Sequence, residues 1–261
     1  MQALQIAATG MSAQQTRVDV ISHNLANMST TGYNARRAEF ADLAYRIPVR
    51  PGSIAAADGT MVPAGVQLGL GVRPTAVSVT IRQGSPLQTS NDLDLAIEGH
   101  GYFEVTMPSG ISAYTRDGGF KRSPDGLMLT SDGHPVEPGI TIPEDARSVA
   151  ISSDGEVHAF FDDQVEPELL GQLTLSRFVN EKGLEAIGSN LFLETGASGP
   201  PTTATPGEEG LGLLRQGYLE ESSVDPVHEI TELIKAQRGY ELNSKVITAA
   251  DQMMAATVQV R

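Results

Sequence analysis

The 261-residue sequence contains no cysteine and no tryptophan, and aromatic residues make up only 5% of it. The absence of cysteine excludes disulfide bonds and thiol catalysis, so thiols give no hint of the redox compartment. Apolar runs are short as well, and none approaches the roughly 20 residues that span a membrane. With a net charge of −14, the chain is expected neither to bind nucleic acid nor to insert directly into a membrane.

The N-terminal segment also lacks the pattern of a secretory signal peptide. It contains polar residues such as Gln2, Gln5 and Asp19, and its first basic residue is Arg17. A signal peptide would show a basic start followed by an apolar run. Composition alone therefore predicts a cytoplasmic protein.

Sequence motifs for catalysis are missing too. The chain has no phosphate-binding loop, no complete dinucleotide-binding glycine pattern and no nucleophile elbow. Its five histidines are scattered, with no pair four residues apart, so a zinc site is not expected. Glu98 and His100 flank a glycine and could bring a carboxylate and an imidazole together, but two glycines at a tight corner explain the segment better. We predict a protein that is not an enzyme and that has no metal site and no cofactor.

Both ends of the chain carry apolar residues that repeat every seven positions. The N-terminal repeat consists of Leu4, Met11, Val18 and Leu25, with Ala7, Ile21 and Met28 at the second apolar position of the heptads. The C-terminal repeat consists of Leu233, Tyr240, Ile247 and Met254, with Ala236 and Ala250 between them. Such repeats predict helices that pack against other helices. At ~1.5 Å per residue, these helices would be about 40 Å and 50 Å long.

The boundaries of the two helices are marked by local signals. Asp225 followed by Pro226 is typical of a helix start, because the aspartate side chain caps backbone N–H groups and proline needs no N–H partner there. We expect the N-terminal helix to continue to about Met28, with Gly32 in a left-handed conformation after its end.

An apolar stripe is often only the inner face of a helix that packs on its own domain. Two features favour self-assembly instead. Both helices exceed the average of about 11–12 residues, and residues 246, 247, 250, 253, 254 and 257 cover more than one seam. Because two helices alone could not cover that width, association between chains would supply the missing burial.

The segment between the helices has a different composition. Prolines and glycines between residues 46 and 72 predict an extended linker or a long hairpin. From residue 72 to about 218, alternating apolar residues and Asp-Gly pairs at 117–118, 125–126, 132–133 and 154–155 predict strands joined by tight turns, with a loop at 196–212. The acidic residues look spread along the chain, with a small concentration between residues 220 and 232.

The predicted fold class is therefore α+β. We expect an N-terminal helix within residues 1–32, a linker or long hairpin at 33–72, a β-rich domain with hairpins or a Greek-key order at 73–222, and a C-terminal helix within 223–261. The two end helices would form a coiled-coil domain, and the β-rich domain would be inserted between them.

Two motifs carry a resemblance to a known family. Residues 22–33 (SHNLANMSTTGY) resemble the NNLANxxTxGF/Y signature of bacterial flagellar rod and hook proteins, and residues 236–247 (AQRGYELNSKVI) resemble the C-terminal AQRAYExNSKxI helix of that family. Residues 63–74, 93–103 and 114–118 are similar to the distal rod member. The resemblance covers essentially the whole chain, apart from small departures at His23, where Asn is common, and Gly239, where Ala is usual.

The resemblance implies a structural subunit of the flagellar distal rod. Such subunits polymerise into a stiff, hollow helical shaft that transmits motor torque to the hook and leaves an export channel. The terminal helices would form an inner coiled-coil layer and the β-rich domain an outer layer. The implied location is the periplasmic part of the basal body, reached through the flagellar type III export apparatus without a cleaved signal peptide, which would replace the cytoplasmic prediction.

Further copies of the chain, the proximal rod proteins, the hook protein, the outer ring proteins that act as a bushing, and the export apparatus are the implied partners. The expected subunit-packing residues of the N-terminal helix are Leu4, Met11, Val18, Ile21, Asn24, Leu25, Asn27 and Met28. Those of the C-terminal helix are Leu233, Gln237, Tyr240, Asn243, Ile247, Ala250 and Met254. By analogy with the family, the linker would insert between neighbouring subunits through Pro48, Pro51, Pro63, Gly65 and Leu68, so deleting residues 50–65 should soften or bend the polymer.

Alternatives remain open at this point. A proximal rod or hook subunit of the same family is the nearest of them. A binding module that dimerises through its end helices would use the loops of the β-rich domain for a ligand. A hydrolase would require a nucleophile next to a base, and the sequence shows no such pair.

Overall fold

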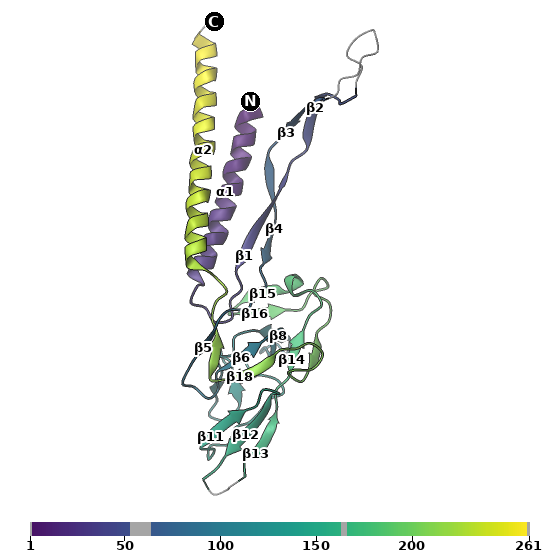
Figure 1. Cartoon of the computed structure of the whole chain (residues 1–261), viewed down its shortest axis with the longest axis vertical. Helices are drawn as coiled ribbons and strands as arrows, with labels where there is room; N and C mark the ends of the chain where they lie inside the picture. Colours follow the sequence, from purple (N-terminus) through teal and green to yellow (C-terminus); the bar gives the residue numbers. More distant parts are fainter. Residues whose placement is uncertain (1, 53–63, 163–165, 260–261) are drawn as a thin grey trace. The chain divides into compact units, whose positions relative to one another are not determined.

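A computed structural model of the chain describes residues 2–52, 64–162 and 166–259. Helix α1 (Gln2–Ala26) and helix α2 (Pro226–Gln259) lie at the two ends, and the segment between them is rich in strands (Figure 1). The predicted α+β class is therefore confirmed. Within the described ranges, neither helix combines the length and the apolarity that crossing a bilayer requires.

The chain divides into two compact units. We call the first the helical unit; it contains Met1–Leu25, Arg36–Ser78 and Asp225–Arg261. We call the second the β unit; it contains Ala26–Ala35 and Val79–Val224. Residues 36–78, which the sequence assigned to a separate linker and to the start of the β-rich domain, thus group with the two helices.

The helical unit contains four strands in addition to its helices: β1 (Arg36–Asp42), β2 (Tyr45–Val49), β3 (Val66–Gly69) and β4 (Val72–Val79). Strand β1 pairs with β4, and β2 pairs with β3 in antiparallel register. Together they form a long two-stranded ribbon (Figure 1). The sequence predicted either an extended linker or a long hairpin between residues 46 and 72, and the described residues form a hairpin.

Local hydrogen bonds explain where the helices begin and end. The Asp225 carboxylate accepts hydrogen bonds from the backbone N–H groups of Val227 (3.0 Å) and His228 (3.3 Å), which confirms the predicted start of α2. Helix α1 ends at Ala26, two residues earlier than expected. Gly32 does adopt a left-handed conformation (φ +64°), but in a later turn, where its N–H donates to the Glu220 carbonyl oxygen.

The β unit consists of several small antiparallel sheets. Its strands are β5 (Pro86–Gln88), β6 (Leu95–Glu98), β7 (Phe103–Thr106), β8 (Ser112–Thr115), β9 (Lys121–Arg122), β10 (Met128–Leu129), β11 (Ser148–Ile151), β12 (Glu156–Phe160), β13 (Glu168–Gln172), β14 (Leu175–Arg177), β15 (Glu185–Gly188), β16 (Leu191–Leu193), β17 (Thr202–Ala204), β18 (Leu213–Gln216) and β19 (Tyr218–Glu220). The larger sheets have the strand orders β15-β16-β8-β7 and β11-β12-β13; β18 pairs with β6, β19 with β5, and β14 with β17. A short 3₁₀ helix, η1 (Glu181–Gly183), precedes β15.

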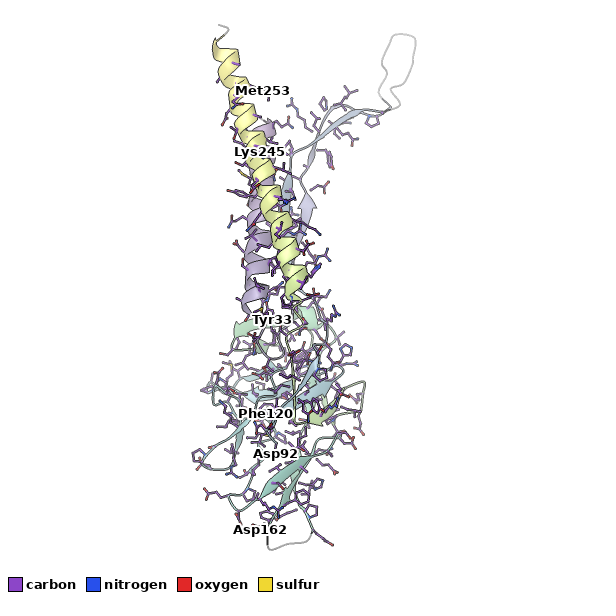
Figure 2. The ribbon with its side chains drawn as sticks, turned by 60° about the vertical axis from the view of Figure 1, so that its left-hand side comes forward. Tyr33, Asp92, Phe120, Asp162, Lys245 and Met253 are labelled. Carbon is purple, nitrogen blue, oxygen red and sulfur yellow. The ribbon has the colours of Figure 1, made fainter. Side chains whose placement is uncertain are left out.

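The core of the β unit is built from the inward-facing residues of these strands. Phe103 and Phe120 meet edge to face with their ring centroids 4.9 Å apart, and both are almost completely buried. Figure 2 shows Phe120 among the side chains of this unit. A second, smaller cluster joins Tyr102, Tyr114 and Phe178. Burial of these side chains is the main stabilising contribution to the unit.

Three of the four Asp-Gly pairs form the predicted turns, because Gly126, Gly133 and Gly155 have φ values of +86° to +88°. The prediction for Asp117-Gly118 was wrong. Gly118 lies against β6: its carbonyl oxygen accepts from the Leu95 N–H at 3.0 Å, and a side chain at this position would overlap the Leu95 carbonyl oxygen, so the glycine permits a close backbone approach. The loop expected at 196–212 is also interrupted, since it contains strand β17.

The two units differ sharply in charge. The β unit contains 23 of the 32 acidic residues and 8 of the 18 basic residues, which gives a formal charge of −15. The helical unit contains 9 acidic and 10 basic residues and is close to neutral. Segments of the two units alternate along the chain, because the helical unit is assembled from three separated segments. The sequence alone therefore does not show that the acidic residues gather in one unit.

Candidate functional site

The two helices of the helical unit lie side by side and run in opposite directions (Figure 1). Arg17 of α1 forms an ion pair with Glu232 of α2. One or two turns further along, Asn24 of α1 donates from Nδ2 to Glu229 Oε1 of α2 at 3.2 Å. These contacts join the end of α1 to the beginning of α2.

Asn24 also connects α1 to the strand ribbon. Its side chain donates to the Arg36 carbonyl oxygen (2.8 Å) and accepts from the Arg36 N–H (2.9 Å). The side-chain amide of Asn24 and the backbone N–H and C=O of Arg36 thus all have hydrogen-bond partners. With 1% of its surface exposed, Asn24 is the most buried polar residue of α1. The contacts of Asn24 tie together elements of one chain, and its role in packing between subunits stays a prediction.

The other predicted packing residues fall into three groups by exposure. Ile21 and Ala250 are buried. Half-buried positions are Leu4, Met11, Val18, Leu25, Asn27, Leu233, Asn243, Ile247 and Met254. The exposed ones are Met28, which lies beyond the end of α1, Gln237 and Tyr240. Some of the predicted packing residues are therefore buried within the chain, and others remain accessible to solvent.

Helix α2 also presents exposed apolar side chains that are not among the predicted subunit-packing residues. They are Val227, Ile230, Ile234, Leu242, Val246 and Met253, and each is 47 to 74% exposed. Lys245 and Met253 are labelled along this helix in Figure 2. An exposed apolar surface on this scale, on a long helix, is typical of a protein–protein contact.

Charged groups at the helix contact are held in their ionised forms. A hydrogen bond from Lys235 Nζ to Glu232 Oε1, 2.7 Å long, is the main reason that the pKa of Glu232 lies below its ordinary value. The nearby positive charge of Arg17 lowers this pKa further. Glu232 thus connects the two helices as a carboxylate.

The strand ribbon is the second candidate surface. Strands β2 and β3 expose Tyr45, Ile47, Val49, Val66 and Leu68, whose exposed fractions lie between 39 and 52%. Of the predicted linker residues, Pro48 lies in β2, Leu68 lies in β3, Pro51 follows β2 in a turn, and Gly65 precedes β3 next to Val49. Pro63 lies outside the described residues.

The β unit contains a cavity of about 170 Å³. His100, Tyr102, Glu181, Arg116 and Glu220 are among the residues that line it. These groups pair with one another: Glu181 contacts His100 Nδ1 and the Tyr102 hydroxyl, each at 3.2 Å, and Glu220 contacts Arg116. Burial is the main reason that the pKa of Tyr102 is raised well above its ordinary value.

The Glu98–Gly101 segment bends as the glycine interpretation predicted. Gly99 and Gly101 have φ values of +121° and +139°. Glu98 instead contacts Arg215 at 2.8 Å, while His100 contacts Glu181, so no carboxylate–imidazole pair forms within the motif. Among the described residues, no group of three His, Asp or Glu side chains is arranged to hold a metal ion.

Sequence reasoning missed the buried pair of Arg116 and Glu220. Each side chain is at most 7% exposed, and Arg116 also donates to the carbonyl oxygens of Gly99 (2.6 Å) and Gly101 (2.9 Å). The two residues are 104 positions apart, so spacing gave no signal. The only hint was that Arg116 belongs to residues 114–118, which resemble the distal rod member.

Comparisons with known proteins agree with the two-ended arrangement. The family model described as "Flagella basal body rod protein" matches residues 4–34, and "Flagellar basal body rod FlgEFG protein C-terminal" matches residues 215–260. A third model, "Flagellar hook protein FlgE/F/G D1 domain", matches residues 96–159. The three matches thus include α1, α2 and part of the β unit.

Similar proteins extend over the full chain. The flagellar basal-body rod protein FlgG of Caulobacter vibrioides is 54% identical over 261 residues, which is 100% of each chain. FlgG of Agrobacterium fabrum is 47% identical over 253 residues, 97% of each chain. FlgG of Borreliella burgdorferi is 46% identical over 256 residues, 97% of this chain and 96% of that one. The protein therefore belongs to the FlgG family of flagellar basal-body rod proteins, the structural subunits of the flagellar rod.

Proposed function

We propose that copies of this chain polymerise into the distal part of the rod, a stiff, hollow helical shaft that transmits motor torque to the hook and carries the export channel. In this proposal, helices α1 and α2 of many copies form a coiled-coil layer. The proposal is supported by the family membership and by the helical unit, whose α2 presents more apolar surface than α1 covers.

The exposed apolar side chains of α2 are the observation that carries the proposal. Fully burying a large apolar side chain contributes about 1.5–3 kcal/mol. Val227, Ile234, Leu242 and Met253, all at least 48% exposed, would gain part of that amount against a neighbouring copy. The near-neutral charge of the helical unit allows close approach, because little electrostatic repulsion has to be overcome.

The strand ribbon supplies a second contact in this proposal. A two-stranded hairpin alone is marginally stable in water, and strands β2 and β3 expose apolar side chains along most of their length. We infer that the ribbon lies between neighbouring subunits and stiffens the polymer, with Pro48, Pro51, Gly65 and Leu68 at this contact. Proline in an edge strand is compatible with such a position, because it removes an N–H group that would otherwise pair.

The proposed surroundings follow from membership of the rod family. The polymer would lie in the periplasmic part of the basal body after passage through the flagellar export apparatus. Its neighbours would be the proximal rod proteins, the hook protein and the outer ring proteins that act as a bushing. No catalytic role, metal or cofactor is part of this proposal.

A second candidate within the same structural class is a proximal rod or hook subunit. The observation that favours it is the match of residues 96–159 to a domain described for the hook protein as well as for rod proteins. The full-length matches to FlgG favour the distal rod.

Sedimentation velocity of the full chain over a wide range of concentrations tests the proposal. A polymer predicts a critical concentration, above which large species form while the monomer concentration stays constant. A monomer or dimer at every concentration, with preformed rod ends present as seeds, would contradict it and would favour a binding module dimerised by its end helices.

A further inference from the structure

We infer that a four-residue layer, made of Gly10 and Gln14 of α1 and Gly239 and Asn243 of α2, fixes the register in which the two terminal helices of one chain pair. We call these four residues the glycine–amide layer. The inference concerns contacts within a single chain and stands independently of the proposed polymer.

Each glycine of the layer faces an amide of the opposite helix. A Cβ atom on Gly10 would lie 2.9 Å from Nδ2 and 3.1 Å from Cγ of Asn243, which is so close that the Asn243 side chain would have to move. A Cβ atom on Gly239 would lie 3.2 Å from Cδ and 3.3 Å from Nε2 of Gln14. The amides therefore occupy the space that the missing side chains leave.

The spacing makes this fit reciprocal in one direction only. On each helix, the glycine and the amide are four residues apart, which places them on the same face one turn from each other. In the antiparallel pair, Gly10 meets Asn243 while Gln14 meets Gly239. A parallel pair would place glycine opposite glycine and amide opposite amide, leaving a void at one position and a collision at the other.

The layer also distinguishes between registers that the apolar repeat leaves nearly equivalent. Ala236 and Ala250 lie seven residues before and after Asn243, so a slip by one heptad still presents a small residue to α1. Gly10 would then face alanine and leave an unfilled space. Gln14 would face Glu232 or Val246 where no glycine makes room for it. A single polar position in a coiled coil is known to select register in this way.

This selectivity has a cost in stability, which itself indicates a specificity device. Glycine within a helix is unfavourable relative to alanine because it loses more backbone entropy on folding. In addition, Gln14 Oε1 is buried without a hydrogen-bond partner among the described residues. An apolar seam of alanines and leucines would avoid both penalties, but it would not distinguish one heptad from the next.

Cross-linking of two introduced cysteines with a short bis-maleimide tests this inference in the full chain, and the natural absence of cysteine makes the assay specific. The reporter pair is Arg17→Cys with Glu232→Cys, because these residues form an ion pair between the helices in the observed register. Cross-linking is measured at dilute concentration on denaturing gels, which separate the intrachain product from interchain dimers.

Two variants are compared in this reporter background. Gly10→Leu with Gly239→Leu fills both spaces with side chains that Asn243 and Gln14 cannot accommodate by a small shift, and it should lower the intrachain cross-linking yield by about 5- to 30-fold. Gly10→Asn with Asn243→Gly exchanges one space and one amide between the helices, and it should restore cross-linking because the fit and the composition are kept. Ser12→Ala with Ser244→Ala, on exposed positions of the same helices, serves as the control and should match the parent.

Three results would each overturn the inference. The parent reporter could fail to cross-link, which would mean that the helices do not pair in this register. The variant with both spaces filled could cross-link as well as the parent, which would assign the register to the apolar repeat. The exchange variant could lose cross-linking as completely as the filled variant, which would show that complementarity between glycine and amide is not what matters.

Discussion

Arg116 and Glu220 form a buried ion pair in the β unit, with Arg116 Nε donating to Glu220 Oε2 at 2.7 Å. The other carboxylate oxygen accepts from the Gly84 N–H at 2.9 Å, and the Glu220 carbonyl oxygen accepts from the Gly32 N–H at 2.8 Å. The pair thus holds together four segments that are far apart in the sequence, including the one that follows α1 and the one that precedes α2.

Replacing Glu220 with alanine should destabilise the β unit strongly. The substitution leaves Arg116 charged, buried and without its carboxylate, and removal of one partner from a buried pair costs about 3–5 kcal/mol. The free energy of unfolding is measured by urea titration followed by tyrosine fluorescence. Glu221→Ala at the exposed neighbouring position is the control and should change stability by less than about 0.5 kcal/mol. Equal stability of the two variants would contradict the structural role of the pair.

Leu25→Asp and Ile247→Asp should each abolish assembly while the β unit stays folded. Both positions are half-buried in the helical unit, and burying an unpaired carboxylate in an apolar contact is costly. Sedimentation and circular dichroism of the purified variants separate assembly from folding. The control is Ser244→Asp, at an exposed position of α2, and this variant should assemble normally. Rods of normal length in cells that carry either of the first two changes would remove the stripe from the interface.

Leu68→Asp should soften or bend the proposed polymer without preventing its formation. Leu68 is 45% exposed on β3, so the chain itself tolerates a charge there, whereas a contact with a neighbouring subunit would not. The persistence length of the tubes is measured on electron micrographs. Gln67→Asp on the adjacent exposed position is the matched control. Tubes of Leu68→Asp that are as straight as the parent would argue against a stiffening role for the ribbon.

Assembly should become easier as salt concentration rises. The β unit carries a formal charge of −15, so copies brought together in a polymer repel one another. Salt shortens the distance over which charges interact, from about 10 Å at 0.1 M to about 3 Å at 1 M, and so weakens this repulsion. The critical concentration, measured by light scattering, should fall with added NaCl. A critical concentration that rises with salt would mean that attractive ion pairs dominate the contacts between subunits.

Asp117→Asn should stabilise the β unit at neutral pH. Burial raises the pKa of Asp117 above its ordinary value of 3.8, so the contribution of this group is favourable at low pH and is lost as the pH rises through the raised value. Asparagine removes the charge and keeps the oxygen that accepts from the Gly119 N–H at 3.0 Å. The gain in the urea midpoint at pH 7 should shrink as the pH falls towards 4, and a gain independent of pH would contradict this explanation.

The parts of the fold that follow local rules were predictable from the sequence. The cap formed by Asp225, the turns at Gly126, Gly133 and Gly155, and the strands around Phe103 depend on neighbouring residues and therefore leave local patterns. The prediction of a turn at Gly118 failed because it also relied on a local pattern alone. An Asp-Gly pair signals a turn, but here the missing side chain serves contact with Leu95, which lies in a different strand.

Long-range relationships were not predictable in the same way. The glycine–amide layer joins positions more than 200 residues apart, and in the sequence Gly239 was only a departure from the alanine that is usual in the family motif. Asn24 and Asn243 were singled out from the family motifs as residues that contact other subunits. In the structure, both have contacts within the chain, because a helix pair in one chain and a helix pair between chains require the same apolar spacing.

Electron microscopy of the purified protein, from dilute to concentrated solution, tests most directly whether this chain builds a straight, hollow shaft. We predict straight tubes of uniform width with a central channel, formed above a critical concentration or on added rod ends. Discrete particles at every concentration, also in the presence of added rod ends, would contradict the claim.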